Sequence, residues 1–114
     1  MRDDNSRYRI NGVPVFLRGT NYIGSLYLAT LDRAVIQRDL DLMLRANINA
    51  VRVHAHVTSP AFYDLADEYG LLVWQELPLS SSGIDNHPPQ DDAFVADLVR
   101  IAESYARRLS HHVS

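Results

Sequence analysis

The sequence of 114 residues is long enough for one compact domain and too short for two. Its hydrophobic fraction of 46% is ordinary for a globular protein, and its net charge of −3 gives no electrostatic reason to expect binding to nucleic acid or to a membrane. The lack of cysteine excludes disulfides, thiolate zinc sites and thiol nucleophiles. The first six residues are polar and acidic, unlike a signal peptide, so a cytoplasmic location is favoured although the sequence does not fix it.

A β-hairpin is the first predicted element. The Asn11-Gly12 dipeptide separates two apolar runs, residues 8–10 and 13–17, and this arrangement is a strong signal for a two-residue hairpin turn. Residues 1–7 before the hairpin are expected to form a polar N-terminal tail. The second arm is expected to continue through Tyr22 as the first strand of a sheet.

Helices and strands alternate along the rest of the chain. The first helix is expected to begin at Thr30 or Asp32 and to end between Asn47 and Asn49. The later elements are a strand over residues 49–57, a helix from Ser59-Pro60 to Gly70, a strand over 71–78, a polar loop over 80–89 and a helix over 91–109. A hairpin followed by three strand-helix units predicts an α/β fold with a parallel sheet. Three units are too few to close a β/α barrel, which takes eight. The chain is therefore expected to be either a small open-sheet domain or the N-terminal part of a larger domain.

The run from residue 49 to residue 57 carries the clearest functional signal. It alternates apolar and polar residues over nine positions, and the polar members are Arg52, His54 and His56. A strand between two helices belongs to a parallel sheet buried on both faces, where such a polar row is costly unless it has a function. In β/α barrels, inward polar groups near the carboxyl ends of the strands form the active site. Arg52 is therefore expected to order a carboxylate by paired hydrogen bonds, and His54 to bind a ligand hydroxyl.

Other interpretations of this strand stay open. The polar face could be a strand edge, or the histidines could be satisfied by backbone carbonyls. Alternatively, His54 and His56 could chelate a metal, as in metal-dependent amidohydrolases, and Glu76 is then the third ligand that the chain offers.

Three further residues are candidate substrate ligands. Glu76 is the only carboxylate near the end of a predicted strand, and such acids are rarely core residues, although a solvated strand end is the alternative. Trp74, two residues earlier on the same predicted face, is either a core residue or a platform for a sugar ring. Asn21, at the end of the first strand, either binds a hydroxyl or serves a turn. Four aspartates on predicted helices are expected to be solvated or to cap a helix: Asp39, Asp41, Asp64 and Asp67. His111-His112 alone carry little signal.

Five stretches of the sequence, in this order and spacing, resemble the start of the catalytic domain of glycoside hydrolase family 2. This family includes β-galactosidases, β-glucuronidases and β-mannosidase-like enzymes. The stretches are residues 10–21 (INGVPVFLRGTN), 39–43 (DLDLM), 47–52 (NINAVR), 63–76 (YDLADEYGLLVWQE) and 110–114 (SHHVS). Together they span nearly all of residues 8–114.

The resemblance implies a partial TIM barrel. The family has a (β/α)8 barrel that usually follows β-sandwich domains, so residues 8–114 would be an incomplete barrel domain with the first three βα units and an N-terminal β-hairpin. Members of the family hydrolyse O-glycosidic bonds with retention of configuration. Asn21, Arg52 and His54 match positions on the substrate side of the family's barrel, and Glu76 matches the acidic residue that closes its third strand. The family's acid/base and nucleophile glutamates would both lie past Ser114.

The chain by itself is expected not to cleave glycosides. Retaining hydrolysis needs two carboxyl groups about 5 to 5.5 Å apart. Of the three glutamates in the sequence, Glu68 and Glu103 are predicted on helices, which leaves Glu76 as the only one at a strand end. The chain is therefore expected to contribute part of a sugar-binding wall and none of the bond-breaking groups.

The leading hypothesis is a fragment of a retaining glycoside hydrolase. The alternatives are a small non-catalytic α/β module that binds a sugar or a metal, and a fragment of a metal-dependent hydrolase that uses His54 and His56. No cofactor is expected in this chain, although the resemblance leaves room for a divalent metal in the parent enzyme. The expected partners are a carbohydrate substrate, the remainder of the barrel and upstream β-sandwich domains.

Overall fold

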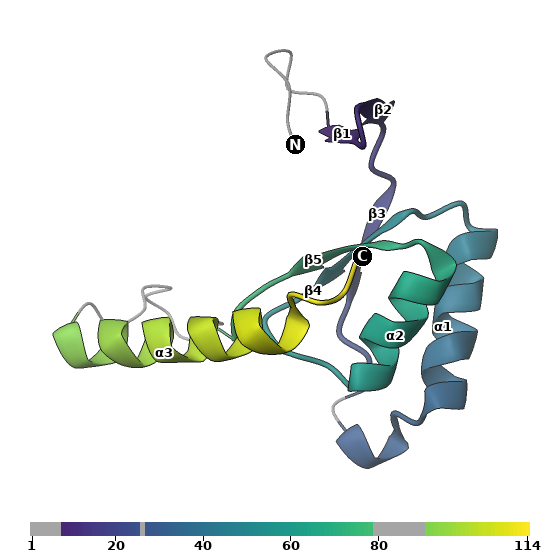
Figure 1. Ribbon diagram of the computed structural model, residues 1–114. Helices are drawn as coiled ribbons and strands as arrows, with labels where there is room; N and C mark the ends of the chain where they lie inside the picture. Colours follow the sequence, from purple (N-terminus) through teal and green to yellow (C-terminus); the bar gives the residue numbers. More distant parts are fainter. Residues whose placement is uncertain (1–7, 26, 79–90) are drawn as a thin grey trace, which may run out of the picture.

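The computed structural model describes residues 8–25, 27–78 and 91–114, and its elements follow the predicted order (Figure 1). The predicted polar tail over residues 1–7 and the predicted loop over residues 80–89 lie outside the described residues. The elements are β1 (Tyr8–Ile10), β2 (Val13–Val15), β3 (Gly19–Tyr22), the short 3-10 helix η1 (Leu28–Thr30), α1 (Arg33–Arg45), β4 (Ala50–Val53), α2 (Pro60–Tyr69), β5 (Leu72–Gln75) and α3 (Asp92–Leu109). The predicted α/β class, with a hairpin followed by three βα units, is confirmed.

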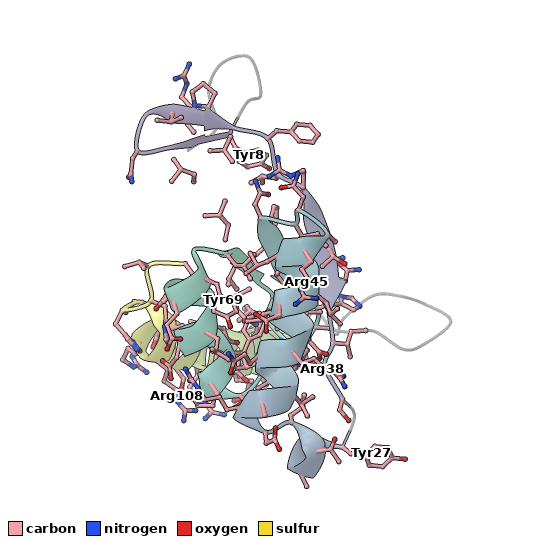
Figure 2. All side chains as sticks on the ribbon, turned by 90° about the vertical axis from the view of Figure 1, so that its right-hand side faces the viewer. Tyr8, Tyr27, Arg38, Arg45, Tyr69 and Arg108 are labelled. Atoms are coloured by element: carbon pink, nitrogen blue, oxygen red, sulfur yellow. The ribbon has the colours of Figure 1, made fainter. Side chains whose placement is uncertain are left out.

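The sheet is parallel, open and three-stranded, with the order β3-β4-β5. Helices α1 and α2 lie side by side on one face of it (Figure 1). Figure 2 looks onto this helix layer, which carries Arg38, Arg45 and Tyr69, with Tyr8 of the hairpin at one end of the molecule and Tyr27 at the other. The fully buried side chains come from β4, α1, α2 and the residue just before β5, and the largest are Phe62, Ile36, Leu40, Leu65, Leu71, Val51 and Val53.

Local signals in the sequence set the ends of α1 and α2. Asp32 is the N-cap of α1, and its carboxylate accepts a hydrogen bond from the backbone N–H of Val35 at 2.8 Å. Pro60 occupies the first turn of α2, where no N–H donor is required. Gly70 ends this helix with a φ of 68°, a left-handed conformation that glycine adopts without steric cost.

The hairpin is confirmed, but its second arm does not run on into the sheet. Asn11 and Gly12 have φ angles of 49° and 80°, which are the angles of a type I′ turn. Strand β2 ends at Val15 and β3 begins at Gly19, so the predicted continuous strand through Tyr22 is wrong. The side chain of Asn49 holds the intervening segment: it accepts from the N–H of Arg18 at 2.8 Å and donates to the carbonyl of Phe16 at 3.0 Å. These bonds replace a strand ladder and turn the hairpin away from the sheet.

The N-cap of α3 is Asp91, whose carboxylate accepts from the N–H of Phe94, and the helix ends at Leu109, as predicted. It has no fully buried residue, and it projects away from the sheet with its carboxyl end against the other elements (Figure 1). None of the helices in the described part of the chain is both long and apolar enough to cross a membrane.

The last residues of the chain lie beside β5. The carbonyl of Ser114 accepts a hydrogen bond from the N–H of Val73 at 2.8 Å. Asp67 on α2 accepts from the backbone N–H of Ser114 and from Nδ1 of His112, both at 2.7 Å. Burial acts to raise the pKa of the Asp67 carboxyl, but the hydrogen bonds from Ser114 and His112 outweigh it and lower this pKa. The prediction that Asp67 is a solvated residue or a cap is therefore wrong, because this carboxylate anchors the segment that follows α3.

The substitution Asp67→Ala should lower the free energy of unfolding by about 1–3 kcal/mol, because it leaves the N–H of Ser114 and Nδ1 of His112 without an acceptor in a mostly buried place. Urea unfolding followed by circular dichroism measures this. Asp64→Ala on the same helix is the matched control, since Asp64 is exposed, and it should change stability by less than about 0.5 kcal/mol. Equal losses in the two variants would mean that Asp67 does not hold the end of the chain.

Candidate functional site

The candidate site lies on the face of the sheet that the helices leave uncovered. Asn21, Arg52 and Trp74 are direct neighbours in the register of β3, β4 and β5, so their side chains project from one face in a row. They line an open cavity of about 580 Å³, which Tyr8 and Ile10 of the hairpin also line. The neighbouring residues in the strands, Tyr22, Val51 and Val53, point the other way and are buried under α1 and α2.

Glu76, directly after β5, connects this row to the turn after β4. Its Oε1 accepts from Nε and Nη2 of Arg52, at 2.7 and 2.5 Å. Its Oε2 accepts from Nδ1 of His54 and from the backbone N–H of Ala55, each at 3.0 Å. A longer contact of 3.4 Å runs from Nη1 of Arg52 to Oδ1 of Asn21. The structure thus brings together four of the five residues that the sequence predicts as substrate ligands, and Trp74 lies beside Arg52 across the strands.

The charge state of Glu76 follows from these contacts. Hydrogen bonds from Arg52, from His54 and from the N–H of Ala55 outweigh the cost of partial burial and lower the pKa of Glu76 from 4.5 to about 2. Glu76 is therefore ionised at neutral pH and cannot serve there as a proton donor. Because an ionised carboxylate only accepts hydrogen bonds, Nδ1 of His54 carries the proton, and Nε2 is left to interact with a ligand.

Arg52 does order a carboxylate, but that carboxylate belongs to the protein. Two of its nitrogens converge on one oxygen of Glu76, and a third faces Asn21. The Arg52 side chain is still 45% exposed, so the guanidinium is fixed at the edge of the cavity rather than enclosed. Arg52 and Glu76 together form a rigid polar border, because each restricts the rotamers of the other.

The predicted strand over residues 49–57 is too long, and His54 and His56 do not share a strand face. Strand β4 ends at Val53, and Ala55 has a φ of 58°, which turns the chain and breaks the alternation of side chains. The ring of His56 folds back so that its Nδ1 lies 2.8 Å from the carbonyl oxygen of His54. His56 is therefore a turn residue, and the interpretation of a histidine bound to a backbone carbonyl applies to it.

No metal centre is present among residues 8–25, 27–78 and 91–114 in the sense of three or more His, Asp or Glu side chains placed to hold one ion. Glu76 has both oxygens bound to Arg52, His54 and Ala55, and the Nδ1 of each histidine already has a partner within the protein. The described residues therefore do not fit a divalent cation, and we assign no chemistry to one.

Trp74 is not a core residue. Its side chain is 61% exposed and lies next to Arg52 across the strands on the cavity side. An exposed indole beside fixed polar groups offers a flat apolar surface next to hydrogen-bonding groups, which is the arrangement in which aromatic rings bind partly apolar ligands.

Two residues of the site were not predicted from the sequence. Tyr63 of α2 donates from its hydroxyl to Oε1 of Gln75 at 2.6 Å, and Nε2 of Gln75 donates to the carbonyls of His56 and Glu76 at 2.6 and 2.5 Å. The signal for Gln75 was present, because an amide near the end of an otherwise apolar strand on the helix side must find partners. The identity of the partner, Tyr63, is not readable from periodicity.

Comparisons with known proteins agree on one family. The model of the TIM barrel domain of glycosyl hydrolases family 2 matches residues 2–113. The β-galactosidase of Staphylococcus xylosus is 36% identical over 84 residues, which cover 70% of this chain and 8% of that protein. The β-mannosidase of Bos taurus is 30% identical over 110 residues, which cover 94% of this chain and 12% of that protein. The crystal structure of a β-D-mannosidase from Dictyoglomus thermophilum superimposes with a TM-score of 0.84 at 28% identity, over 98% of this chain and 14% of that one. The chain thus spans about a tenth of the length of the curated relatives that it matches.

The ionised state of Glu76 predicts how stability depends on pH. A carboxylate with a lowered pKa contributes stability that is complete above its unfolded pKa, near 4.5, and is lost as the pH falls toward 2. Between pH 6 and pH 3, the wild type should therefore lose more stability in urea than Glu76→Gln, which cannot ionise. The matched control is Glu68→Gln, which removes only an exposed ion pair with Arg33 and should change stability at neutral pH little. Parallel loss of stability in the wild type and Glu76→Gln would show that the carboxylate is not held in this way.

We also expect that the chain binds no stoichiometric metal through its histidines. Titration calorimetry with Zn²⁺ and with Mn²⁺ should show no saturable 1:1 binding that disappears in His54→Ala or His56→Ala, because Nδ1 of His54, Nδ1 of His56 and both carboxylate oxygens of Glu76 already have protein partners. Tight 1:1 binding that either substitution abolishes would contradict this and would support the metal-binding module.

Proposed function

Because the chain belongs to glycosyl hydrolase family 2 and corresponds to part of its TIM barrel domain, we propose that it forms part of the sugar-binding wall of a retaining β-glycosidase of the β-galactosidase or β-mannosidase kind. The observation that carries the proposal is the cluster of Arg52, His54 and Glu76 at the carboxyl ends of adjacent parallel strands, beside the exposed Trp74. This end of the strands is where β/α barrels place their active sites.

In this proposal the described residues bind and orient the sugar. The Trp74 ring offers a flat apolar surface to the C–H face of a pyranose, and Nε2 of His54 and the amide of Asn21 offer hydrogen bonds to its hydroxyls. Arg52 and Glu76 keep these groups in place, because their ion pair joins the ends of β4 and β5. Fixed groups of this kind lower the entropic cost of aligning a bound sugar for reaction.

The bond-breaking carboxyl groups are assigned to the rest of the intact protein. A retaining mechanism needs one carboxylate as nucleophile and one carboxylic acid as proton donor, about 5 to 5.5 Å apart. Glu76 is ionised, so it does not suit the role of proton donor, and both of its oxygens are held by donors from Arg52, His54 and Ala55, so it does not suit the role of nucleophile. Glu68 pairs with Arg33 on the helix layer, and Glu103 pairs with Arg107 on α3. Neither glutamate belongs to the candidate site.

The proposed partners of this chain are the remainder of the barrel and upstream β-sandwich domains. The remainder of the barrel would continue the sheet beside β5, where Ser114 already pairs with Val73, and upstream β-sandwich domains would precede the hairpin. The chain's own contribution requires no cofactor. A metal-dependent hydrolase is not proposed, because His54 and His56 diverge after Ala55.

The chain alone should release no nitrophenol from nitrophenyl β-galactoside or β-mannoside, whereas the intact protein should hydrolyse at least one of them. In the intact protein, Trp74→Ala should raise KM about tenfold and Trp74→Phe less, because a ring is worth about 1 kcal/mol of stacking. Phe16→Ala is the control, since Phe16 is also exposed but lies in the segment between β2 and β3, outside the candidate site.

Two results would overturn the proposal. One is hydrolysis by the chain alone that Glu76→Gln abolishes, because Glu76 would then carry the chemistry. The other is an intact protein that binds sugars through Trp74 and hydrolyses none, because the fold would then serve as a binding module.

A further inference from the structure

We propose that Tyr63 and Gln75 are positioning residues for the candidate site: the Tyr63 hydroxyl sets the orientation of the Gln75 amide, and this amide holds the backbone that presents Glu76 and His54. The consequence for sugars rests on the proposed function. The geometry does not, and it can be tested separately.

The hydrogen bonds of Tyr63 and Gln75 have only one possible direction. The Tyr63 hydroxyl oxygen accepts from the backbone N–H of Thr58 at 3.3 Å, so its one hydrogen is free to go to Oε1 of Gln75 at 2.6 Å. With the amide reversed, Oε1 would face the carbonyl oxygens of His56 and Glu76, and acceptor would meet acceptor. Only one orientation of the Gln75 amide therefore satisfies all of its neighbours.

The Gln75 amide holds the backbone at the ends of two strands. Both N–H bonds of Nε2 are used, one to the carbonyl of His56 at 2.6 Å and one to the carbonyl of Glu76 at 2.5 Å. The amide thus connects the end of β5 to the turn that follows β4. That turn has Ala55 in a left-handed conformation with a φ of 58°, which is strained for a non-glycine residue and persists only when the surroundings enforce it.

The turn after β4 contacts the Glu76 carboxylate directly. In this conformation the N–H of Ala55 donates to Oε2 of Glu76, and His54, one residue earlier, binds the same oxygen. A shift of the turn would therefore loosen two of the donors that orient the carboxylate. The Glu76 backbone, held by the same Gln75 amide, would shift together with it.

Tyr63 and Gln75 lie on the side of the sheet away from the cavity. Tyr63 is 3% exposed and belongs to the helix layer, and Gln75 follows Trp74 in β5 and so points to the opposite face of the sheet. Neither lines the cavity beside Arg52 and Trp74. Any effect of Tyr63 and Gln75 on the site must therefore pass through Glu76 and the turn.

The experiment is an NMR titration of the side-chain carboxyl carbon of Glu76 in the 114-residue chain. Tyr63→Phe removes one hydroxyl, and Gln75→Met removes both amide donors at similar length. Each should move the Glu76 titration upward by about one pH unit, because the donors to the carboxylate become less well placed. Tyr69→Phe is the matched control, since Tyr69 is a half-buried tyrosine of the same helix outside this network, and it should leave the titration unchanged.

The wild-type chain offers a second test that needs no variant. The two side-chain amide protons of Gln75 should exchange with solvent at least tenfold more slowly than those of Gln37, which is exposed on α1. Exchange as fast as that of Gln37 would overturn the proposal. So would variants that lower the unfolding midpoint while leaving the Glu76 titration in place, because that is the result of a purely structural role.

In the intact protein, Tyr63→Phe should lower kcat/KM for a nitrophenyl β-glycoside about tenfold, and Tyr69→Phe should not. If the wild type hydrolyses no glycoside, the proposed function fails, and the titration and exchange measurements still decide the positioning role. If the glycosidase is active and Tyr63→Phe leaves both kcat/KM and the Glu76 titration unchanged, the positioning role fails alone.

Discussion

The carboxylate of Glu76 is the interaction on which the geometry of this site depends. It binds Arg52 from β4, His54 and Ala55 from the turn after β4, and it belongs to the segment directly after β5. The parallel register pairs Val53 with Gln75, so the residues that follow each strand emerge side by side. One ionised group can therefore bind donors from both segments. Without it, an arginine at the cavity edge and a left-handed alanine would have no common partner.

The sheet separates stability from function by its two faces. Val51 and Val53 point into the helix layer, where they are buried and hold α1 and α2 to the sheet. Arg52 and Trp74 point to the uncovered face and remain partly exposed. Substitutions on the first face would act through packing, and those on the second through the site. Tyr63 and Gln75 are the exception, because they lie on the helix side and connect that layer to the turn after β4.

The sequence predicts those parts of the structure that local signals determine. The turn at Asn11-Gly12 and the helix end at Gly70 each depend on one or two residues and are confirmed, and the N-cap Asp32 is one of the two residues, Thr30 and Asp32, at which the sequence lets this helix begin. Arg52 and Glu76 were recognisable because polar residues at the ends of apolar strands need partners. The prediction that His56 lies on the same strand face as His54 is wrong, because the alternating pattern continues past the end of β4 at Val53. An alanine gives no sequence signal for the left-handed conformation of Ala55. The links from Asp67 to Ser114 and from Tyr63 to Gln75 join distant residues, so periodicity does not contain them.

Under the proposed function, the charge of the Arg52–Glu76 cluster would limit where the proton donor of the intact protein could lie. Arg52 and Glu76 neutralise each other, and the pair still offers hydrogen-bond donors from the guanidinium and from His54. A carboxyl group placed next to Arg52 would have its pKa lowered, as that of Glu76 is, and would be ionised at neutral pH. A glycosidic oxygen needs a donor with a raised pKa, which requires an apolar surrounding or a nearby negative charge. If the proposed function holds, the acid would therefore lie away from Arg52, toward a part of the pocket built by other strands, and a second carboxylate close to Arg52, besides Glu76, would suit the role of nucleophile.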